Sequence, residues 1–142
     1  KGQYFLDLCS GSGGIGIEAF SRGARKVYMI DKNKTAINLI KKNFSKITFN
    51  IDLDNEMFVL KHDVTKIEEL PLPTFDFIYF DPPYNSNIYS TVLKIISKSR
   101  ILNKKSLVLI ETNQLININK INLENVFSKK IGSSYLQCFK KN

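Results

Sequence analysis

Residues 4–14 of the chain read Tyr-Phe-Leu-Asp-Leu-Cys-Ser-Gly-Ser-Gly-Gly, an apolar run that turns abruptly into small, flexible residues. The apolar part, residues 4–9, predicts a buried strand, and residues 15–22 predict a short helix that ends at Gly23. Glycines between them permit a positive φ and let the backbone approach a ligand closely. A strand, a glycine-rich loop and a helix in this order predict an α/β fold with a ligand at the carboxyl end of its sheet.

The same alternation continues along the chain. Apolar runs predict strands at residues 26–30, 58–61, 75–80 and 106–110, and helical periodicity predicts helices at residues 35–44 and 88–98. Such alternation implies a parallel sheet with right-handed crossovers. Residues 126–131 and 135–139, joined by Gly-Ser-Ser, predict an antiparallel C-terminal hairpin, so the expected sheet is mixed. Residues 113–125 carry no clear pattern.

We expect a single domain over residues 1–142. Hydrophobic residues make up 43% of the 142, enough for a substantial core. No apolar run approaches the ~20 residues of a membrane span, so no membrane partner is expected. Cys9 and Cys138 form neither a metal-ligand spacing nor a disulfide framework, which favours a reducing, cytoplasmic compartment. Because the chain begins at Lys1 and a strand follows almost at once, we expect an N-terminal segment to be missing.

Charge is distributed unevenly along the chain. The net charge is +8, and residues 1–46 and 98–142 carry +6 and +7, whereas residues 47–97 carry −5. A basic surface around an acidic centre suits a polyanionic partner that approaches an acid-lined cleft. A lysine-rich, solvated surface explains the charge on its own equally well.

The glycine loop and an acid on the next strand together indicate a nucleoside site. Asp31 lies 20 residues after Gly11, at the end of the second predicted strand. A carboxylate there can accept hydrogen bonds from ribose hydroxyls. Gly11, Gly13 and Gly16 also satisfy the dinucleotide fingerprint G-x-G-x-x-G, so a nicotinamide enzyme is a rival interpretation of this motif.

Two further acids separate these interpretations. Asp7, at the end of the first strand, suits the positively charged amino group in the methionine part of S-adenosylmethionine, whereas it would repel a pyrophosphate. Asp63, at the end of the third strand, can accept a hydrogen bond from an adenine amino group, and the Val64 amide can serve a ring nitrogen. The structural alternative for Asp63 is a helix N-cap. Together the acids favour S-adenosylmethionine.

Asp81-Pro82-Pro83-Tyr84 is the most specific motif in the chain, and it follows the fourth strand directly. The exocyclic amine of a base is a poor nucleophile, because its lone pair is delocalised into the ring. The Asp81 carboxylate and the Pro82 carbonyl can accept its two N–H groups and face the positive charge that develops on nitrogen. Two prolines stiffen the turn, and Tyr84 offers a ring on which the target base can stack. A Pro-Pro strand terminator with a core aromatic is the structural alternative.

These motifs resemble those of the RsmD-like methyltransferases, which modify guanine N2 in small-subunit (16S) ribosomal RNA. The resemblance rests on residues 7–14, 18–24, 75–84 and 107–111 and on the closing hairpin at 130–140. It implies a Rossmann-like class I methyltransferase fold, with a seven-stranded sheet in the order 3-2-1-4-5-7-6. It also implies ribosomal RNA or the small subunit as partner, S-adenosylmethionine as cofactor with S-adenosylhomocysteine as product, a cytoplasmic monomer and no metal.

Residue roles follow from the same resemblance. The target amine is held by Asp81, Pro82, Pro83 and Tyr84, and the cofactor is expected to contact Asp7, Cys9, Ser10, Gly11, Ser12, Gly13, Asp31, Lys32, Asp63, Val64 and Asp81. Two departures stand out. The basic N-terminal stretch and short helix of the family are absent from the chain, and the last motif residue, often Phe in the family, is Tyr84.

Other polar residues are weaker candidates. Glu18 is expected to point from the first helix toward the sheet or the cofactor, as a buried acid or a catalytic one. His62, the only histidine, is expected to be structural, since no metal-ligand cluster accompanies it. Glu111 ends the fifth strand on the ligand side, where it either approaches substrate or is simply exposed.

Alternative functions remain open from sequence. An adenine-N6 methyltransferase acting on DNA or RNA shares the Asp-Pro-Pro-Tyr motif, although such enzymes often carry an extra target-recognition region. Methylation of a protein glutamine is disfavoured, because those enzymes have Asn in place of Asp81. A nucleic-acid-binding domain with a relic cofactor site is disfavoured by the presence together of Asp7, Asp31, Asp63 and Asp81.

Overall fold

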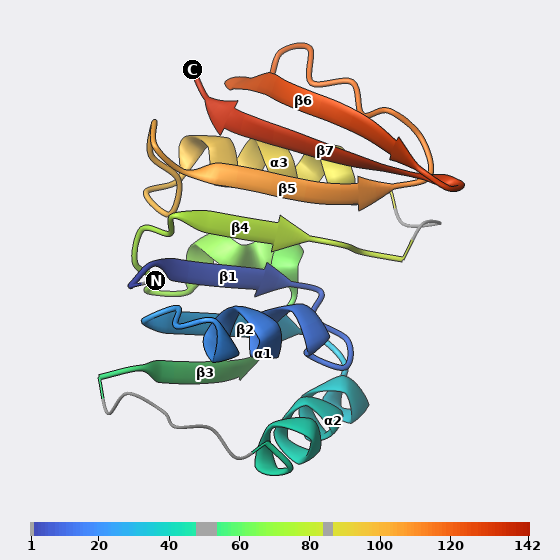
Figure 1. Ribbon diagram of the computed structural model, residues 1–142. Helices are drawn as coiled ribbons and strands as arrows, with labels where there is room; N and C mark the ends of the chain where they lie inside the picture. Colours follow the sequence, from blue (N-terminus) through green and yellow to red (C-terminus); the bar gives the residue numbers. More distant parts are fainter. Residues whose placement is uncertain (1, 48–53, 84–86) are drawn as a thin grey trace.

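A computed structural model describes residues 2–47, 54–83 and 87–142. The described residues form one seven-stranded sheet in the order β3-β2-β1-β4-β5-β7-β6, which confirms the expected order (Figure 1). Neighbouring strands among the first five run parallel, and β7 is antiparallel to both β5 and β6. The strands are β1 (Tyr4–Leu8), β2 (Lys26–Asp31), β3 (Glu56–Lys61), β4 (Phe77–Phe80), β5 (Leu107–Thr112), β6 (Leu123–Ile131) and β7 (Ser134–Lys141).

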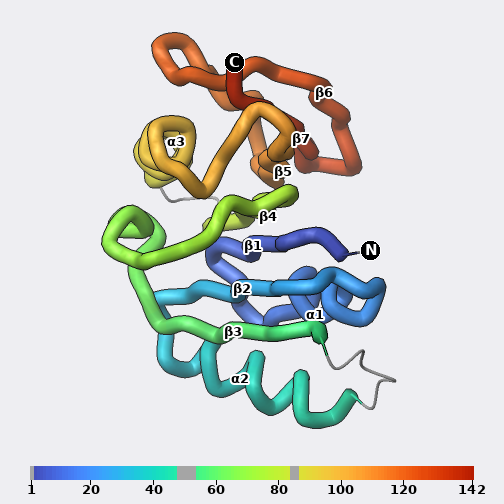
Figure 2. Tube along the Cα trace, turned by 90° about the vertical axis from the view of Figure 1, so that its left-hand side faces the viewer, coloured from blue at the N-terminus to red at the C-terminus, as the bar shows by residue number. Residues whose placement is uncertain are grey.

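Helices lie on both faces of the sheet, as Figure 2 shows in a view turned by 90° from that of Figure 1. The helices are α1 (Gly14–Ser21), α2 (Lys34–Ser45), the 3₁₀ helix η1 (Val64–Glu69) and α3 (Tyr89–Lys98). A smaller core packs α1 and α2 against β2, with Met29 and Ile40 fully buried at its centre. A larger core packs η1 and α3 against the other face, around Phe75 and Phe80. Parallel strands covered on both sides explain why the central strands are apolar along their whole length.

Several elements differ in their bounds from the sequence-based prediction. The fourth strand begins at Phe77 instead of residue 75, because the Phe75 amide donates to the Ile101 carbonyl in the loop after α3 (3.0 Å). The helix η1 was predicted only through the structural alternative for Asp63, a helix N-cap, because six residues of 3₁₀ helix give no periodic pattern. The hairpin is longer than expected, and Gly132 at its turn has a φ of 61°.

Within the described residues, no helix has the length and apolar character needed to cross a membrane.

Two glycines set how closely α1 packs on the sheet. A Cβ added at Gly16 would lie 2.5 Å from both Cγ and Sδ of Met29 and 3.2 Å from the Asp7 carboxylate. Gly13, with a φ of 80°, is the residue before α1, and a Cβ there would lie 2.9 Å from Ile40. The first helix therefore sits against β1 and β2 at a distance that only glycine allows.

Gly16→Ala should lower the free energy of unfolding by about 1–3 kcal/mol, because the new methyl group overlaps the buried Met29 side chain. Gly14→Ala is the matched control. Gly14 is exposed, and a Cβ there meets nothing closer than the Ser12 hydroxyl at 3.9 Å, so stability should hold or rise slightly. Urea denaturation of both variants measures the difference, and equal midpoints would contradict the packing argument.

Candidate functional site

One cavity of about 870 Å³ opens at the carboxyl ends of the central strands. Parallel strands bring the loops after β1, β2, β3 and β4 to this rim. The predicted site residues that line it are Asp7, Cys9, Ser10, Gly11, Ser12, Asp31, Lys32, Asp63, Val64, Asp81, Pro82 and Pro83. Residues that the sequence did not single out also line it, namely Gly14, Ile15, Asn33, Ala36, Thr65, Tyr79 and Ile88. Gly13 is buried at the start of α1, and Tyr84 lies outside the described residues.

The glycine loop doubles back on itself directly after β1. Its backbone takes positive φ values at Cys9 (62°), Gly11 (55°) and Gly13 (80°). The Gly13 amide donates to the Ser10 carbonyl at 2.8 Å, and the Ser10 hydroxyl donates to the Asp7 carbonyl at 2.7 Å. A positive φ is uncommon for a residue with a side chain, so Cys9 is held in a costly conformation at the cavity wall. Burial raises the pKa of its thiol to about 12, which keeps the thiol protonated.

Asp7 is a buried acid at the base of the cavity, with only 2% of its surface exposed. Its Oδ2 accepts a hydrogen bond from the Gly16 amide at 3.0 Å. Burial raises the pKa of Asp7 to about 7, against the lowering effect of the Gly16 amide, and the charges of Asp81 and Asp31 raise it further. A cation placed beside this carboxyl would stabilise its ionised form, which burial disfavours.

Asp31 is held at the end of β2 by two backbone amides. Its Oδ2 accepts from Gly11 at 3.0 Å, and its Oδ1 accepts from Asn33 at 2.8 Å. The Asn33 side chain in turn caps α2 by accepting from the Thr35 amide. The carboxylate thus joins the glycine loop to the start of α2, and each oxygen still has capacity for a further donor.

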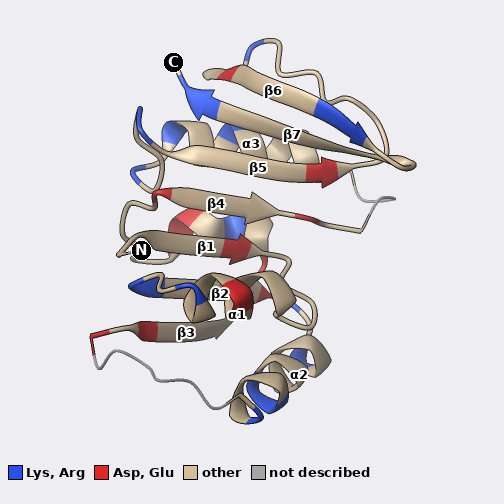
Figure 3. Cartoon of the chain, in the orientation of Figure 1, with Lys and Arg blue, Asp and Glu red and all other residues tan. Residues whose placement is uncertain are grey.

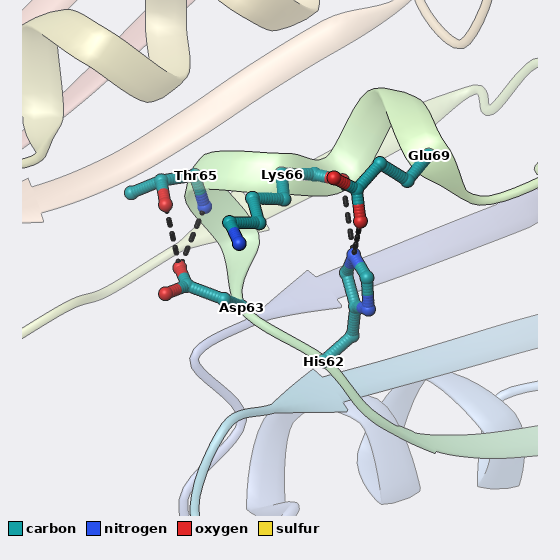
Figure 4. A network of polar contacts seen from close by, with 5 residues as sticks. All are labelled: His62, Asp63, Thr65, Lys66 and Glu69. Atoms are coloured by element: carbon teal, nitrogen blue, oxygen red, sulfur yellow. Dashed lines mark hydrogen bonds and ion pairs between the residues drawn. The ribbon is translucent and has the colours of Figure 1, made fainter.

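Asp63 caps the 3₁₀ helix η1, as its structural alternative predicted. Both contacts converge on Oδ1, which accepts from the Thr65 amide at 2.9 Å and the Thr65 hydroxyl at 2.8 Å (Figure 4). These hydrogen bonds lower the pKa of Asp63, and the charge of Lys32 contributes in the same direction. Capping and ligand contact are compatible, because Asp63 also lines the cavity and carries a second carboxylate oxygen.

His62 takes the structural place that the sequence suggested. Its Nε2 lies 2.9 Å from the Lys66 carbonyl oxygen and 3.7 Å from the Glu69 carboxylate (Figure 4). Both partners belong to η1, so the ring ties the end of β3 to the following turn.

The turn after β4 is fixed by a residue that the sequence analysis missed. The Tyr89 hydroxyl, at the start of α3, lies 3.3 Å from the Pro82 carbonyl oxygen and 3.1 Å from the Glu111 carbonyl oxygen. Its single proton is shared between them. Tyr89 and Pro82 are both buried, whereas Pro83 is exposed. The Pro82 carbonyl, which is expected to hold a target amine, therefore already accepts one hydrogen bond, and its second lone pair can accept another.

Two acids lie at the carboxyl ends of β4 and β5: Asp81 lines the cavity, and Glu111 lies close enough for its charge to act on Asp81. Burial raises the pKa of Asp81, and the nearby charge of Glu111 raises it further. The Tyr79 hydroxyl donates to Glu111 Oε2 at 3.1 Å. Burial also raises the pKa of Tyr79, with Asp81 and Glu111 adding to the effect, so Tyr79 stays a proton donor at neutral pH. Figure 3 shows acidic segments at the carboxyl ends of β1 and β5.

Glu18 does not belong to this cluster, and the expectation that it points inward is wrong. It is exposed on α1 and forms an ion pair with Arg22 one turn later, at 2.6 Å. In an eight-residue helix, Gly16, Ile17 and Phe20 fill the buried face instead. Among residues 2–47, 54–83 and 87–142, no cluster of three or more His, Cys, Asp or Glu side chains could hold a metal ion.

Comparisons with known proteins agree with the fold. The family model described as "Conserved hypothetical protein 95" matches residues 1–140. The chain is 30% identical over 107 residues to the ribosomal RNA small subunit methyltransferase D of Haemophilus influenzae, covering 75% of this chain and 55% of that relative. The chain thus spans only about half the length of the curated relatives it matches.

Solved structures show the same architecture. A conserved hypothetical protein from Streptococcus pyogenes matches with a TM-score of 0.79 and 28% identity, covering 100% of this chain and 88% of that one. The ribosomal protein L11 methylase of Lactobacillus delbrueckii subsp. bulgaricus matches with a TM-score of 0.77 over 100% of this chain and 71% of that one. Its identity is 15%, so this second match shows the class I methyltransferase fold alone.

Asp7→Asn should change how stability depends on pH. The Asp7 carboxyl has a pKa of about 7 in the folded state and near 3.8 in the unfolded chain, so the folded state holds its proton more tightly. The resulting stabilisation is complete below pH 3.8. As the pH rises toward 7 it is lost, by at most about 1.4 kcal/mol per pH unit. Asparagine does not titrate and can still accept a hydrogen bond from the Gly16 amide. The free energy of unfolding of the variant should therefore rise relative to that of the wild type as the pH increases over this range. Urea unfolding at pH 4, 5.5, 7 and 8 tests this, and a constant difference between the proteins would contradict it.

Proposed function

This chain belongs to the family described as Conserved hypothetical protein 95, the RsmD-like methyltransferases, and on that premise we propose that it methylates the exocyclic N2 amine of a guanine in small-subunit ribosomal RNA with S-adenosylmethionine. One observation carries the proposal. The Asp81-Pro82 turn and the glycine loop with Asp7 line the same cavity, so a methyl donor and an amine held by these groups would meet.

The residues around the glycine loop suit S-adenosylmethionine. When bound, this cofactor supplies an electrophilic methyl group on a positively charged sulfur. The buried Asp7 carboxyl would hold its ammonium group, which restores the ionised form that burial opposes. Asp31, fixed by two backbone amides, would accept from the ribose hydroxyls. The second oxygen of Asp63 would accept from the adenine amine, since both Thr65 contacts use Oδ1.

The turn after β4 suits the amine of a nucleobase. The Asp81 carboxylate would accept one N–H of that amine, and the Pro82 carbonyl the other. The position of the Pro82 carbonyl is maintained by Tyr89, so the acceptor pair is rigid before substrate arrives. The nitrogen must lose one proton when it gains a methyl group. A carboxylate whose pKa is raised by burial, as that of Asp81 is, is a better proton acceptor than an exposed one.

Charge supports an RNA partner. The net charge is +8, and a basic segment, Lys129 and Lys130 at the end of β6, lies at the same end of the sheet as the acidic end of β5 (Figure 3). Phosphates would be held by such lysines. A paired target base would first have to be flipped out of its helix to reach the cavity.

The substrate is tested by incubating the protein with labelled S-adenosylmethionine and, separately, naked ribosomal RNA, small ribosomal subunits and DNA. Label should appear on N2 of a guanine in small-subunit RNA, as mapped by nuclease digestion and mass spectrometry. Label on N6 of an adenine, in RNA or DNA, would overturn the guanine assignment and support the alternative activity.

Asp81→Ala should bind S-adenosylmethionine with nearly normal affinity but lose methyl transfer by about 100-fold or more, because an amine held by one acceptor loses both alignment and charge stabilisation. Calorimetric titration and single-turnover transfer separate the two effects. Asp54→Ala, which removes an exposed acid in the segment before β3, is the control and should change neither. Near-normal turnover of Asp81→Ala would exclude the proposed role of this carboxylate.

Asp31→Ala should instead weaken binding of S-adenosylmethionine by about tenfold or more, because it removes a charged acceptor for the ribose and a partner of the Gly11 amide. The same titration measures it. An unchanged dissociation constant would count against the ribose assignment and leave the role of Asp81 unaffected.

A further inference from the structure

A second carboxylate stands beside Asp81 at the end of the neighbouring strand. In the parallel register of β4 and β5, Tyr79 pairs with Leu109 and Phe80 with Ile110, so the next residues along, Asp81 and Glu111, are neighbours at the rim. The charge of each is felt by the same hydroxyl, that of Tyr79. The function described so far gives Glu111 no role.

Glu111 is held at two points. Its side chain accepts from the Tyr79 hydroxyl at 3.1 Å, and its backbone carbonyl lies 3.1 Å from the Tyr89 hydroxyl. Tyr79 lines the cavity, and Tyr89 also contacts the Pro82 carbonyl. The Glu111 carboxylate is therefore fixed relative to the Asp81-Pro82 turn, as a recognition group must be if it is to act on a base held there.

The two purines differ in what they offer next to the exocyclic amine. Guanine carries its N2 amine beside N1–H, so the edge presents adjacent donors. Adenine carries its N6 amine beside N1, which is an acceptor. A carboxylate accepts hydrogen bonds and has no proton to donate when ionised. A second carboxylate next to the amine-holding acid therefore suits guanine and repels the N1 lone pair of adenine.

We propose that Glu111, positioned by Tyr79, accepts the N1–H of the target guanine while Asp81 holds its N2 amine, and that this pair selects guanine over adenine. The inference rests on the proposed function and deepens it. Tyr79 donates to Oε2, which orients the carboxylate, and a carboxylate can accept hydrogen bonds from several donors at once.

The test uses a base that keeps the amine but lacks the neighbouring donor. 2-Aminopurine has the same exocyclic 2-amine as guanine, but its N1 is an acceptor. RNA oligonucleotides that span the mapped position, with guanine or 2-aminopurine at that position, give a ratio of kcat/KM values. The wild type should favour guanine by at least about tenfold, the scale expected when a charged group loses its hydrogen-bond partner.

Glu111→Gln should reduce that ratio by about tenfold or more, because the amide NH₂ can donate to the 2-aminopurine N1 lone pair. Tyr79→Phe, which removes only the hydroxyl that orients Glu111, should reduce it partly and needs no rearrangement of the core. Glu124→Gln, an exposed acid on β6 that pairs with Lys140, is the matched control and should keep the wild-type ratio. A merely structural role of Glu111 would lower both rates together and leave the ratio unchanged.

Each outcome bears on a different claim. A wild type that methylates both RNAs equally, or an unchanged ratio in Glu111→Gln and Tyr79→Phe, overturns the role of Glu111 while the proposed function stands. A wild type that methylates neither oligonucleotide, nor ribosomal RNA, nor small ribosomal subunits, although it binds S-adenosylmethionine, overturns both. If Glu111→Gln fails to fold by urea denaturation, the ratio measured with Tyr79→Phe decides.

Discussion

The hydrogen bond from the Gly16 amide to the Asp7 carboxylate is the contact on which fold and site both depend. It joins α1 to β1 at 3.0 Å, and the missing side chain at Gly16 lets the same helix press against Met29 of β2. With the helix pinned to two adjacent strands, the loop between β1 and α1 has little freedom. It must turn through positive φ values at the rim, where its backbone faces the cavity. One acid near the end of β1 thus anchors a helix and lines the cavity.

This arrangement has an electrostatic cost that is concentrated at the rim. Burial raises the pKa of both Asp7 and Asp81; the charges of Asp81 and Asp31 raise that of Asp7 further, and the charge of Glu111 raises that of Asp81. A domain selected for stability alone would disperse such charges or replace them. A cationic ligand would offset both the repulsion between the carboxylates and the cost of burying them, because it brings a compensating positive charge. Its contacts are made only in the folded state, so its binding would also stabilise the fold. Under the proposed function, binding of S-adenosylmethionine would therefore stabilise the fold as well as supply the methyl group.

Most of the fold, and much of the cavity lining, follows from features that a sequence displays locally. Strand ends are marked by glycine, proline or acid residues, and a parallel sheet brings those ends to one rim, so Asp7, Asp31 and Asp81 could be placed together in advance. The order of the strands came from family resemblance instead. What stayed hidden depends on contacts across the chain. Tyr89 matters through the carbonyls of Pro82 and Glu111, 7 and 22 residues away, and η1 is too short to show a period. Glu18 was misplaced because two helical turns define the buried face poorly.

Under the proposed function, opposite charges would have separate roles in recognising RNA. A polyanion cannot approach a rim of carboxylates with its phosphates first, so its backbone must rest on a basic segment, such as the end of β6. Only the base, which carries no formal charge, can enter between the acids. It enters most favourably when its N–H donors point toward the carboxylates. The carboxylates that hold an amine for transfer would therefore also keep phosphate away from the methyl donor. If the proposed function holds, selection for nucleic acid and selection for one edge of one base would come from one pattern of charge, negative at the rim and positive at the neighbouring end of β6.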